Sequence, residues 1–478
     1  MFNISIREEF MDPNQKYKNV IIIDAATRGD AFASYITGIS SIRSVKVIPG
    51  NGGTRIRKNK QLDLRNHFPR NEFASVESIP VRSGPHQLLS GYIESIVGYA
   101  QMTSSSLLIN GPADLLEAGI VDKFIAEGMG ECIFGPTREA ARIEWSKPFA
   151  KKLMFKYGIP TAPYRVFDSS KEASAYIIAH GAPIVVKAVG LSFGKASYIC
   201  PTVDDALQKV FMIMITLEHG AAGKSVVIED YVPGLEFSVH ALCDGHARKD
   251  SFIMLPPTQD HKQIYEGNRG PNTGGMGVIC PVPWVSDDIM NRVGEEIILP
   301  MLKALSRHRS PFRGCLNPNI ILAEDGSLSV ADWNARFGDP ETPVLMRLME
   351  GDLTQVLRAC AEGRLSEVKD TLSFKKEFAV CVMLISEGYP EKYESGFEIT
   401  GIEEAEKIPG VVVYYGRTDY DEGELLTASG RPLCVTAVGD TLQEAIDTVY
   451  AGVENIHFTG KSYRRDIGLQ AMEWIRQH

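Results

Sequence analysis

The chain has 478 residues, enough for several domains, and its 44% hydrophobic and 23% charged residues are typical of a globular protein. Its 50 lysines and arginines against 60 aspartates and glutamates give a net charge of −10. This acidity argues against nucleic acid or an anionic membrane as a partner, because both bind basic surfaces. No apolar run reaches the roughly 18 residues that a membrane-spanning helix needs.

The eight cysteines are scattered along the chain and form no C-x-x-C pair. This spacing predicts reduced, mostly buried thiols in a cytoplasmic protein, and it argues against a disulfide or zinc framework. Residues 1–18 are polar and acidic. We therefore expect them to form an N-terminal extension rather than a secretory signal.

An open α/β domain is predicted over residues 19–138. The β-branched run Asn19–Asp24, which ends in an acid, indicates a buried strand of a parallel sheet. The patterns that follow it are a helix at 31–39 and strands at 44–49, 107–110 and 132–134.

A hairpin-bearing subdomain is predicted over residues 139–215 and a central subdomain over residues 216–374. The first begins with a helical pattern at 139–157, which ends at Gly158, a typical C-cap residue. The later patterns are strand 183–187, turn 190–195, strand 198–200, strand 226–232 and the alternating strand 237–243.

A glycine-rich segment, GPNTGGMG at residues 270–277, follows the polar motif TQDHK at residues 258–262. Closely spaced glycines let a backbone approach an anion and direct N–H groups toward it. Taken alone, the segment is a weak signal, and the alternative is an ordinary surface turn. It matches neither a dinucleotide-binding fingerprint nor a Walker loop.

The segment VADWNARFGDPET at residues 330–342 places Asp332, Asn334 and Arg336 two residues apart. On a strand these side chains share one face. A carboxylate and an amide oxygen suit Mg²⁺, which keeps water and phosphate oxygens as its other ligands, and an arginine suits phosphate. The alternative is a solvated strand end followed by a Gly-Asp-Pro turn.

A smaller α+β domain is predicted over residues 375–478. Its patterns are strands at 380–385 and 411–415 and a helix at 441–454 that begins with a capping residue.

TQDHK, GPNTGGMG, WNARFGDPET and the C-terminal YRRDIG together resemble the phosphoribosylamine–glycine ligases, also called glycinamide ribonucleotide synthetases. The resemblance runs from about residue 19 to the end. It implies an ATP-grasp fold with an N-terminal open α/β (pre-ATP-grasp) domain and a small C-terminal α+β domain. It further implies ATP with Mg²⁺ or Mn²⁺, an acyl-phosphate intermediate, a small-molecule acid and amine as substrates, and a monomer or homodimer.

The resemblance also implies roles for individual residues. Asp332, where the family has Glu, and Asn334 would hold the metal, and Arg336 would neutralise the transferred phosphoryl group. The residues that would contact ATP are Lys147, Lys187, Gly194, Lys195, Glu229, Asp230, Tyr231, Val232 and Glu236. For Lys187, the alternative is a solvated lysine at a strand end.

On the substrate side, Asp260, His261 and Lys262 would place the amine or the acyl phosphate. His261 would serve either as a base or as a structural residue that holds the loop. The other residues implied to contact substrate are Arg28, Asn51, Gly52, Asn272, Thr273, Gly274 and Gly275.

The chain departs from the family pattern mainly on the acceptor side. DAATRGDA at residues 24–31 replaces GNGGREHA, and Asp24 and Asp30 would repel a substrate phosphate. Further departures are Ala113, where the family has an acid, Phe193 and Ala196 in the hairpin turn, and Asn317 and Asn319.

These departures favour a ligase that joins a different acid or amine, as in a specialised biosynthetic pathway. The first alternative is a true phosphoribosylamine–glycine ligase of purine synthesis. The second is a non-catalytic nucleotide-binding regulator, which the Asp332, Asn334 and Arg336 set disfavours because a sensor needs no such complete set.

Overall fold

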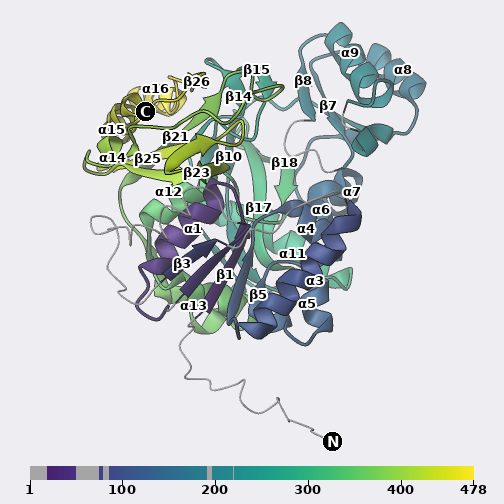
Figure 1. The fold of residues 1–478 in the computed structure, drawn as a ribbon. Coiled ribbons are helices and arrows are strands. Elements are labelled where there is room, and N and C mark those ends of the chain that lie inside the picture. Colours follow the sequence, from purple (N-terminus) through teal and green to yellow (C-terminus); the bar gives the residue numbers. More distant parts are fainter. Residues whose placement is uncertain (1–18, 43, 50–74, 79–85, 191–195, 219) are drawn as a thin grey trace, which may run out of the picture.

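The protein is described here by a computed structural model. The described residues are 19–42, 44–49, 75–78, 86–190, 196–218 and 220–478. Figure 1 shows the N-terminal sheet at the bottom, the C-terminal sheet at the upper left and a small lobe at the upper right, with β17 and β18 between them. Within the described ranges, no helix has both the length and the apolar character needed to span a bilayer.

The N-terminal domain is an open α/β unit, as predicted. Its sheet has the order β3-β2-β1-β4-β5, and every neighbouring pair is parallel. The strands are β1 (Asn19–Asp24), β2 (Ser44–Pro49), β3 (Ser75–Ser78), β4 (Leu107–Asn110) and β5 (Ile133–Phe134). The helices are α1 (Thr27–Thr37), α3 (His86–Met102), α4 (Ala113–Glu117) and α5 (Ile120–Ala126), and a 3₁₀ turn, η1, covers Gly130–Cys132.

Helix α1 begins at Thr27, four residues before the predicted start at residue 31. The reason is a contact far along the chain: the Asp339 carboxylate accepts hydrogen bonds from the Arg28 backbone N–H (3.0 Å) and from the Thr27 hydroxyl. A carboxylate at this position satisfies otherwise unpaired N–H groups and stabilises the positive end of the helix.

The helix predicted over residues 139–157 is in fact two helices, α6 (Arg138–Trp145) and α7 (Lys147–Tyr157), separated at Ser146. Pro148 explains the break, because proline has no N–H to continue the helical hydrogen bonds of α6, whereas it is tolerated in the first turn of α7. The predicted C-cap is confirmed: Gly158 has φ +69° and ends α7.

The small lobe, called the lid below, comprises residues 164–230. Its antiparallel sheet has the order β6-β9-β7-β8. The elements are β6 (Tyr164–Phe167), α8 (Ser170–His180), β7 (Ile184–Ala188), β8 (Ser197–Cys200), α9 (Val203–Met214), the 3₁₀ turn η2 (Gly220–Lys224) and β9 (Val226–Asp230). The predicted turn at residues 190–195 lies almost wholly outside the described residues.

The central sheet is built on the long strand β17 (Arg313–Leu322), which pairs on one side with β10 and β11 and on the other with β18. The single strand predicted at 237–243 is split into two, because Pro318 has no N–H to continue the ladder opposite Val239. The elements are β10 (Leu235–Ser238), β11 (Ala241–Asp244), β12 (Phe252–Met254), α10 (Asp287–Arg292), η3 (Val293–Ile298), α11 (Leu299–Arg307) and β18 (Leu328–Asn334).

The C-terminal sheet has the order β13-β16-β21-β25-β22, with β26 paired to β21. Strands β13 (Gln259–Asp260) and β16 (Gly277–Cys280) therefore bring the TQDHK and GPNTGGMG motifs against this domain. The other strands are β14 (Gln263–Tyr265), β15 (Arg269–Asn272), β19 (Met349–Gly351), β20 (Leu372–Phe374), β21 (Phe378–Ser386), β22 (Val412–Tyr415), β23 (Thr418–Asp421), β24 (Glu424–Thr427), β25 (Leu433–Gly439) and β26 (Lys461–Ser462). The helices are α12 (Glu341–Leu348), α13 (Leu353–Glu362), η4 (Leu365–Glu367), η5 (Lys369–Thr371), α14 (Ile402–Ala405), α15 (Leu442–Asn455) and α16 (Leu469–Gln477).

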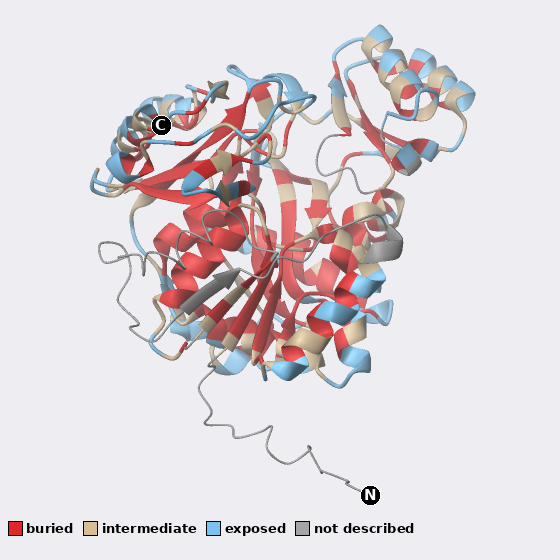
Figure 2. Ribbon diagram, in the orientation of Figure 1, coloured by how far each residue is buried: buried red, intermediate tan, exposed pale blue. Residues whose placement is uncertain are grey.

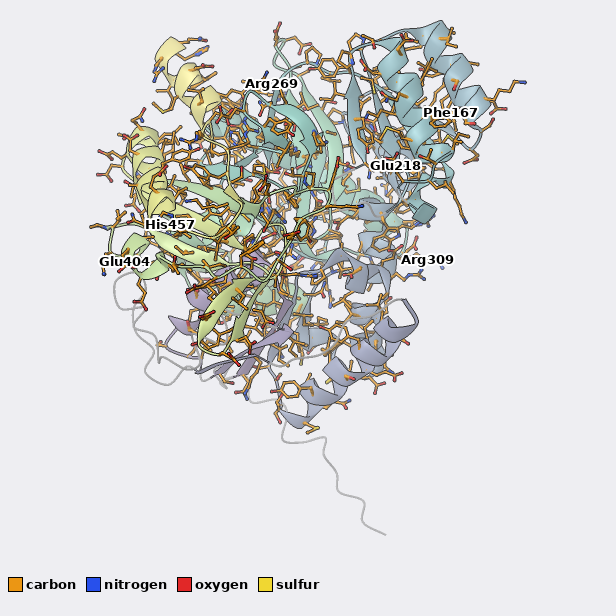
Figure 3. The ribbon with its side chains drawn as sticks, turned by 45° about the horizontal axis from the view of Figure 1, so that its top comes forward. Phe167, Glu218, Arg269, Arg309, Glu404 and His457 are labelled. Atoms are coloured by element: carbon orange, nitrogen blue, oxygen red, sulfur yellow. The ribbon has the colours of Figure 1, made fainter. Side chains whose placement is uncertain are left out.

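The apolar core is divided into a large cluster and a small one. The large cluster runs through the N-terminal, central and C-terminal sheets, whereas the lid has its own cluster around Ile177, Val186 and Ile228. Figure 2 shows this contrast, with buried strands through the body and largely exposed helices on the lid. In Figure 3, Phe167 and Glu218 mark the lid, and Glu404 and His457 mark the opposite side of the molecule.

The predicted state of the cysteines is confirmed. All eight lie in the described part of the chain and have free thiols, and seven of them are buried.

Asp30 is a structural residue that joins two domains. It is 1% exposed on α1, and its carboxylate accepts a hydrogen bond from the Tyr415 backbone N–H of β22 at 3.0 Å. We predict that Asp30→Ala lowers the free energy of unfolding by about 1–3 kcal/mol, because a buried N–H loses its acceptor. Urea denaturation measures this. The variant Glu131→Ala, at an exposed residue of the same domain, is expected to stay close to wild type, and an equal loss in both variants would contradict the assignment.

Candidate active site

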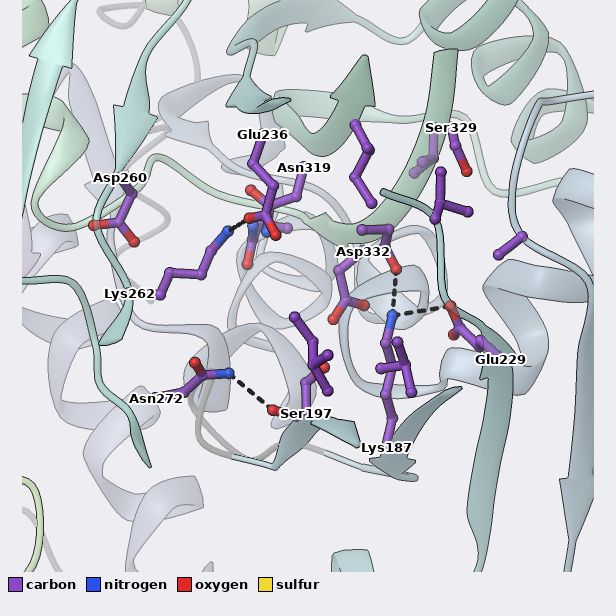
Figure 4. A pocket seen from close by; sticks show the side chains of 18 of the residues that line it. Lys187, Ser197, Glu229, Glu236, Asp260, Lys262, Asn272, Asn319, Ser329 and Asp332 are labelled. Carbon is purple, nitrogen blue, oxygen red and sulfur yellow. Dashed lines mark hydrogen bonds and ion pairs between the residues drawn. The ribbon is translucent and has the colours of Figure 1, made fainter. Parts of the chain in front are cut away.

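One pocket gathers most of the predicted site residues between the lid, the central sheet and the C-terminal sheet. Figure 4 shows side chains of this pocket converging from all these elements. The predicted residues that line it are Lys147, Lys187, Glu229, Asp230, Tyr231, Val232, Glu236, Asp260, Lys262, Asn272, Thr273, Gly274, Asp332, Asn334 and Arg336. Arg28, His261 and Gly275 are not part of the lining, and Asn51, Gly52, Phe193, Gly194 and Lys195 lie outside the described residues.

An ion cluster lies at the lid side of the pocket. The Glu229 Oε2 atom lies 2.9 Å from Lys151 Nζ and 3.1 Å from Lys187 Nζ. Lys187 also donates to the Ala331 carbonyl at 2.7 Å. Lys187 is 4% exposed, so it is not the solvated lysine of the alternative interpretation.

The pKa values of Lys151 and Lys187 are shifted in opposite directions. Burial lowers the pKa of Lys151, and the positive charge of Lys187 adds to this effect despite Glu229. Burial alone would also lower the pKa of Lys187, but Glu229 and Asp332 together raise it above its ordinary value. Lys187 is therefore a stable positive charge on the pocket wall.

Asp332 and Asn334 lie on one face of β18, as predicted, and Arg336 lies just beyond the end of this strand. Asp332, Asn334 and Arg336 are half-buried and line the pocket, whereas the residues between them are buried on the other side. The register of β17 against β18 shifts between Asn319 and Ile320 and leaves Ala331 without a strand partner. This bulge frees the Ala331 carbonyl that Lys187 contacts.

The Asp332 carboxylate is ionised and surrounded by cations. Burial alone would raise its pKa, but Lys147 and Lys187 lower it below the ordinary value, and Lys147 Nζ lies 3.8 Å from Asp332 Oδ2. Asn334 Oδ1 accepts a hydrogen bond from Arg336 Nη2 at 3.1 Å. The Asp332 carboxylate and the Asn334 side-chain amide therefore both face the pocket.

This donor set fits Mg²⁺ or Mn²⁺ held by few protein ligands. Asp332 and Asn334 offer hard oxygens, and the buried Oε1 of Glu229 has no hydrogen-bond partner. Among the described residues, no group of three or more His, Cys, Asp or Glu side chains could hold a metal. An ion here would keep water and phosphate oxygens as its remaining ligands, as Mg²⁺ does.

Arg336 is held by Glu144, a residue that the sequence did not indicate. Arg336 Nη2 lies 3.2 Å from Glu144 Oε1, and Glu144 Oε2 accepts the Ala335 backbone N–H at 2.9 Å. Glu144 is 7% exposed. Sequence reasoning also missed Lys151, although its i, i+4 spacing from Lys147 on one helix face was a usable signal.

The motif TQDHK supplies Asp260 and Lys262 to the pocket. Lys262 Nζ lies 2.6 Å from Glu236 Oε2 and holds the pKa of that carboxyl below its ordinary value. Burial, reinforced by Glu341, raises the pKa of Asp260 to about 7. The Asp260 Oδ1 atom is buried without a hydrogen-bond partner.

His261 is a structural residue in this geometry, which corrects the prediction of a catalytic role. Its Nδ1 bonds to the Gly277 carbonyl at 3.1 Å, and its Nε2 accepts the Gly468 N–H at 3.2 Å. Burial lowers its pKa to about 4. Both ring nitrogens are occupied, so the geometry supports the loop-holding alternative rather than proton transfer.

Four consecutive N–H groups of the glycine-rich segment, from Thr273 to Met276, are already bonded within the protein and do not face an anion, contrary to the sequence-based expectation. The N–H groups of Thr273, Gly274, Gly275 and Met276 donate to the Lys262 carbonyl, the Tyr389 hydroxyl, the Thr273 hydroxyl and the His261 carbonyl, respectively. The segment is an internally bonded wall. It also holds the lid, because the Asn272 side-chain amide donates to the Ser197 carbonyl at 2.8 Å.

The two acids expected to repel a substrate phosphate are both partnered. Asp24 Oδ2 lies 2.5 Å from Arg28 Nε, and Asp24 Oδ1 accepts the Ala26 N–H at 2.9 Å. Asp30 faces β22. The expected repulsion assumed free carboxylates, and the structure contradicts that assumption. Arg28 itself is buried and also donates to the Phe337 carbonyl at 2.8 Å.

Comparisons with known proteins cover nearly the whole chain. Models of the phosphoribosylglycinamide synthetase N domain, ATP-grasp (A) domain and C domain match residues 18–144, 145–342 and 379–470. A phosphoribosylamine–glycine ligase of Rhodopirellula baltica is 37% identical over 462 residues, covering 95% of this chain and 98% of the relative.

Solved structures agree with these matches. The phosphoribosylamine–glycine ligase structure from Thermotoga maritima has a TM-score of 0.73 and 29% identity, covering 94% of this chain and all of that one (100%). A biotin carboxylase domain from Hydrogenobacter thermophilus, solved with MgADP, has a TM-score of 0.67 at 16% identity, with 94% and 92% covered. The second likeness shows the fold alone.

We predict a pH-dependent stability difference at Asp260. Its pKa rises from 3.8 to about 7 on folding, so the folded protein binds more protons in this window. The stability contributed by this group is present below pH 4 and is lost as the pH rises through 7. Asp260→Asn, which is always neutral, should melt roughly 2–4 °C above wild type at pH 8, and this difference should become smaller at pH 5, where the loss of stability is only beginning.

Differential scanning fluorimetry without ligands measures this difference. The exposed variant Asp421→Asn should show no such trend between the two pH values. A difference between Asp260→Asn and wild type that does not change with pH would show that Asp260 does not hold its proton in the folded state.

Proposed function

The chain belongs to the phosphoribosylglycinamide synthetase family of ATP-grasp carbon–nitrogen ligases, and from that premise we propose that it joins glycine to phosphoribosylamine, with ATP converted to ADP and phosphate. The observation that carries the proposal is the match to phosphoribosylamine–glycine ligases over 95% of the chain. The pocket supports it by bringing the cationic and metal-binding groups of the motifs together.

The comparisons favour this activity over a ligase with a different acid or amine. The preference for a different acceptor relied on Asp24 and Asp30 as free charges, and both are partnered. Membership of a ligase family also leaves no support for a non-catalytic regulator.

The proposed first step joins the glycine carboxylate to the γ-phosphorus of ATP. An oxygen of the carboxylate attacks, the bond to the β-phosphate oxygen breaks, and ADP leaves with the electron pair. Lys147, Lys187 and Arg336 neutralise the charge on the phosphates, and positioned cations are the main source of rate in such transfers. Asp332 and Asn334 would hold Mg²⁺ or Mn²⁺, which when bound would neutralise negative charge on the ATP phosphates.

The second step joins the amine to the acyl carbon. The amine nitrogen attacks the acyl phosphate, phosphate leaves, and the nitrogen gives up one proton. Asp260, with its pKa at about 7, is the group beside Lys262 that accepts this proton. The adenine would lie against the backbone of Glu229–Val232, and Glu236 would bind the ribose hydroxyls.

Several accompanying expectations stay predictions. They are the cytoplasmic location, a monomer or homodimer, and domain boundaries near residues 138, 215 and 375. The roles of Arg28, Asn51, Gly52, Gly194, Lys195 and Gly275 also stay predictions.

We predict that wild-type protein releases ADP and forms glycinamide ribonucleotide when it is given ATP, Mg²⁺, glycine and phosphoribosylamine. Asp332→Ala should lower this turnover by about 100-fold to 1000-fold, because a positioned charge at the transferring phosphate is lost. A coupled ADP assay and mass spectrometry of the product measure both. The exposed variant Glu324→Ala, in the turn before β18, should retain wild-type turnover.

Two outcomes would contradict the proposal. One is wild-type ADP release that depends on an amine other than phosphoribosylamine, and the other is undiminished product formation by Asp332→Ala.

A further inference from the structure

We propose that Arg431 of the C-terminal domain is a positioning residue for the amine-acceptor half of the site. Arg431 lies between β24 and β25 and belongs to none of the motifs discussed above. It does not line the pocket, yet its guanidinium contacts two segments that do. The inference rests on the proposed function for the identity of the acceptor.

The guanidinium joins the glycine-rich segment to the Gly-Asp-Pro turn. Arg431 Nη1 donates to the Gly274 carbonyl at 2.6 Å and to the Gly275 carbonyl at 3.3 Å. Arg431 Nη2 donates to Asp339 Oδ2 at 2.8 Å. The planar guanidinium group can donate in different directions to two backbone carbonyls and a carboxylate, whereas a single ammonium group cannot reach all of them.

The Arg431 guanidinium and the Asp260 carboxylate both lie close to the backbone of the glycine-rich segment. A Cβ atom added to Gly274 would lie 2.8 Å from the Arg431 guanidinium, and one added to Gly275 would lie 2.6 Å from Asp260 Oδ1. The segment is therefore held between Arg431 on one side and Asp260 on the other. Tyr389, on the same domain as Arg431, adds a second contact by accepting the Gly274 N–H at 3.0 Å.

Asp339 extends the effect of Arg431 to the N-terminal domain. One carboxylate oxygen bonds to Arg431, and the other accepts the Arg28 backbone N–H at the start of α1. Burial alone would raise the pKa of Asp339, but Arg431 and Arg28 lower it below its ordinary value. The ionised Asp339 carboxylate of the central subdomain thus joins the N-terminal and C-terminal domains at the edge of the pocket. Arg431 is its counter-ion.

The contacts of Arg431 indicate which of the two reaction steps should depend on it. The groups proposed to bind ATP are Lys147, Lys187 and the Glu229–Val232 strand end, and Arg431 contacts none of them. Its partner Gly275 instead lies against Asp260, the proposed proton acceptor for the amine. Loss of Arg431 should therefore disturb amine attack and spare ATP binding.

The test compares Arg431→Gln and Arg431→Lys with wild type. For Arg431→Gln we expect kcat/KM for phosphoribosylamine to fall about 10-fold to 100-fold while KM for ATP changes less than about twofold. ADP released per product formed should rise above one, because acyl phosphate that waits for the amine is hydrolysed. Arg431→Lys, which keeps the charge and loses the fork, should lie between Gln and wild type.

Two further variants keep the test decisive. Arg476→Gln, an exposed arginine on α16 of the same domain, should behave as wild type. Tyr389→Phe removes the other contact to Gly274 and should shift kcat/KM for the amine in the same direction by a smaller factor. It carries the test if Arg431→Gln does not fold.

If the wild-type protein is inactive with glycine and phosphoribosylamine, the proposed function is refuted. This result alone does not refute the positioning role of Arg431. With an active wild type, the positioning role is overturned by either of two results. One is an unchanged kcat/KM for the amine in Arg431→Gln or, if that variant does not fold, in Tyr389→Phe. The other is an equal rise in KM for ATP and for the amine.

Discussion

The ion cluster around Glu229 is the interaction on which the pocket depends. A site for a nucleotide phosphate needs fixed cations, but ammonium groups with little exposure are unfavourable unless a counter-ion is close. Glu229 supplies that charge to Lys151 and Lys187 through a single oxygen atom. It therefore lets the strand β7 present Lys187 to the pocket as a stable positive charge while Lys151 stays behind it.

Because buried charges need partners, the acidic residues seen in the sequence led to a wrong prediction for the acceptor side of the site. Asp24 and Asp30 were treated as free acids beside a phosphate site, yet each has a partner, which for Asp24 is the nearby Arg28. The partner of Asp30 is a backbone N–H on β22, 385 residues away in the chain. A carboxylate acts on a substrate through its residual charge, and pairing removes most of that charge.

Local periodicity made much of the fold and part of the site predictable. The alternation at Asp332 and Asn334 needs only the geometry of one strand, and the parallel N-terminal sheet needs only the order of apolar runs. The bulge at Ala331 and the support of Arg336 by Glu144 depend on residues that meet only after folding. Glu144 and Ala335, for instance, are 191 positions apart. No pattern in a single sequence encodes such contacts.

The separate core of the lid has a consequence for how the site admits its nucleotide. Because the apolar cluster around Val186 and Ile228 is not continuous with the large one, rotating the lid as a unit exposes little apolar surface. Polar contacts then determine the orientation of the lid relative to the rest of the protein, and the Asn272–Ser197 hydrogen bond is one of these contacts. Opening would trade such bonds for bonds to water, a nearly balanced exchange, so entry of the nucleotide requires no partial melting of the body of the enzyme.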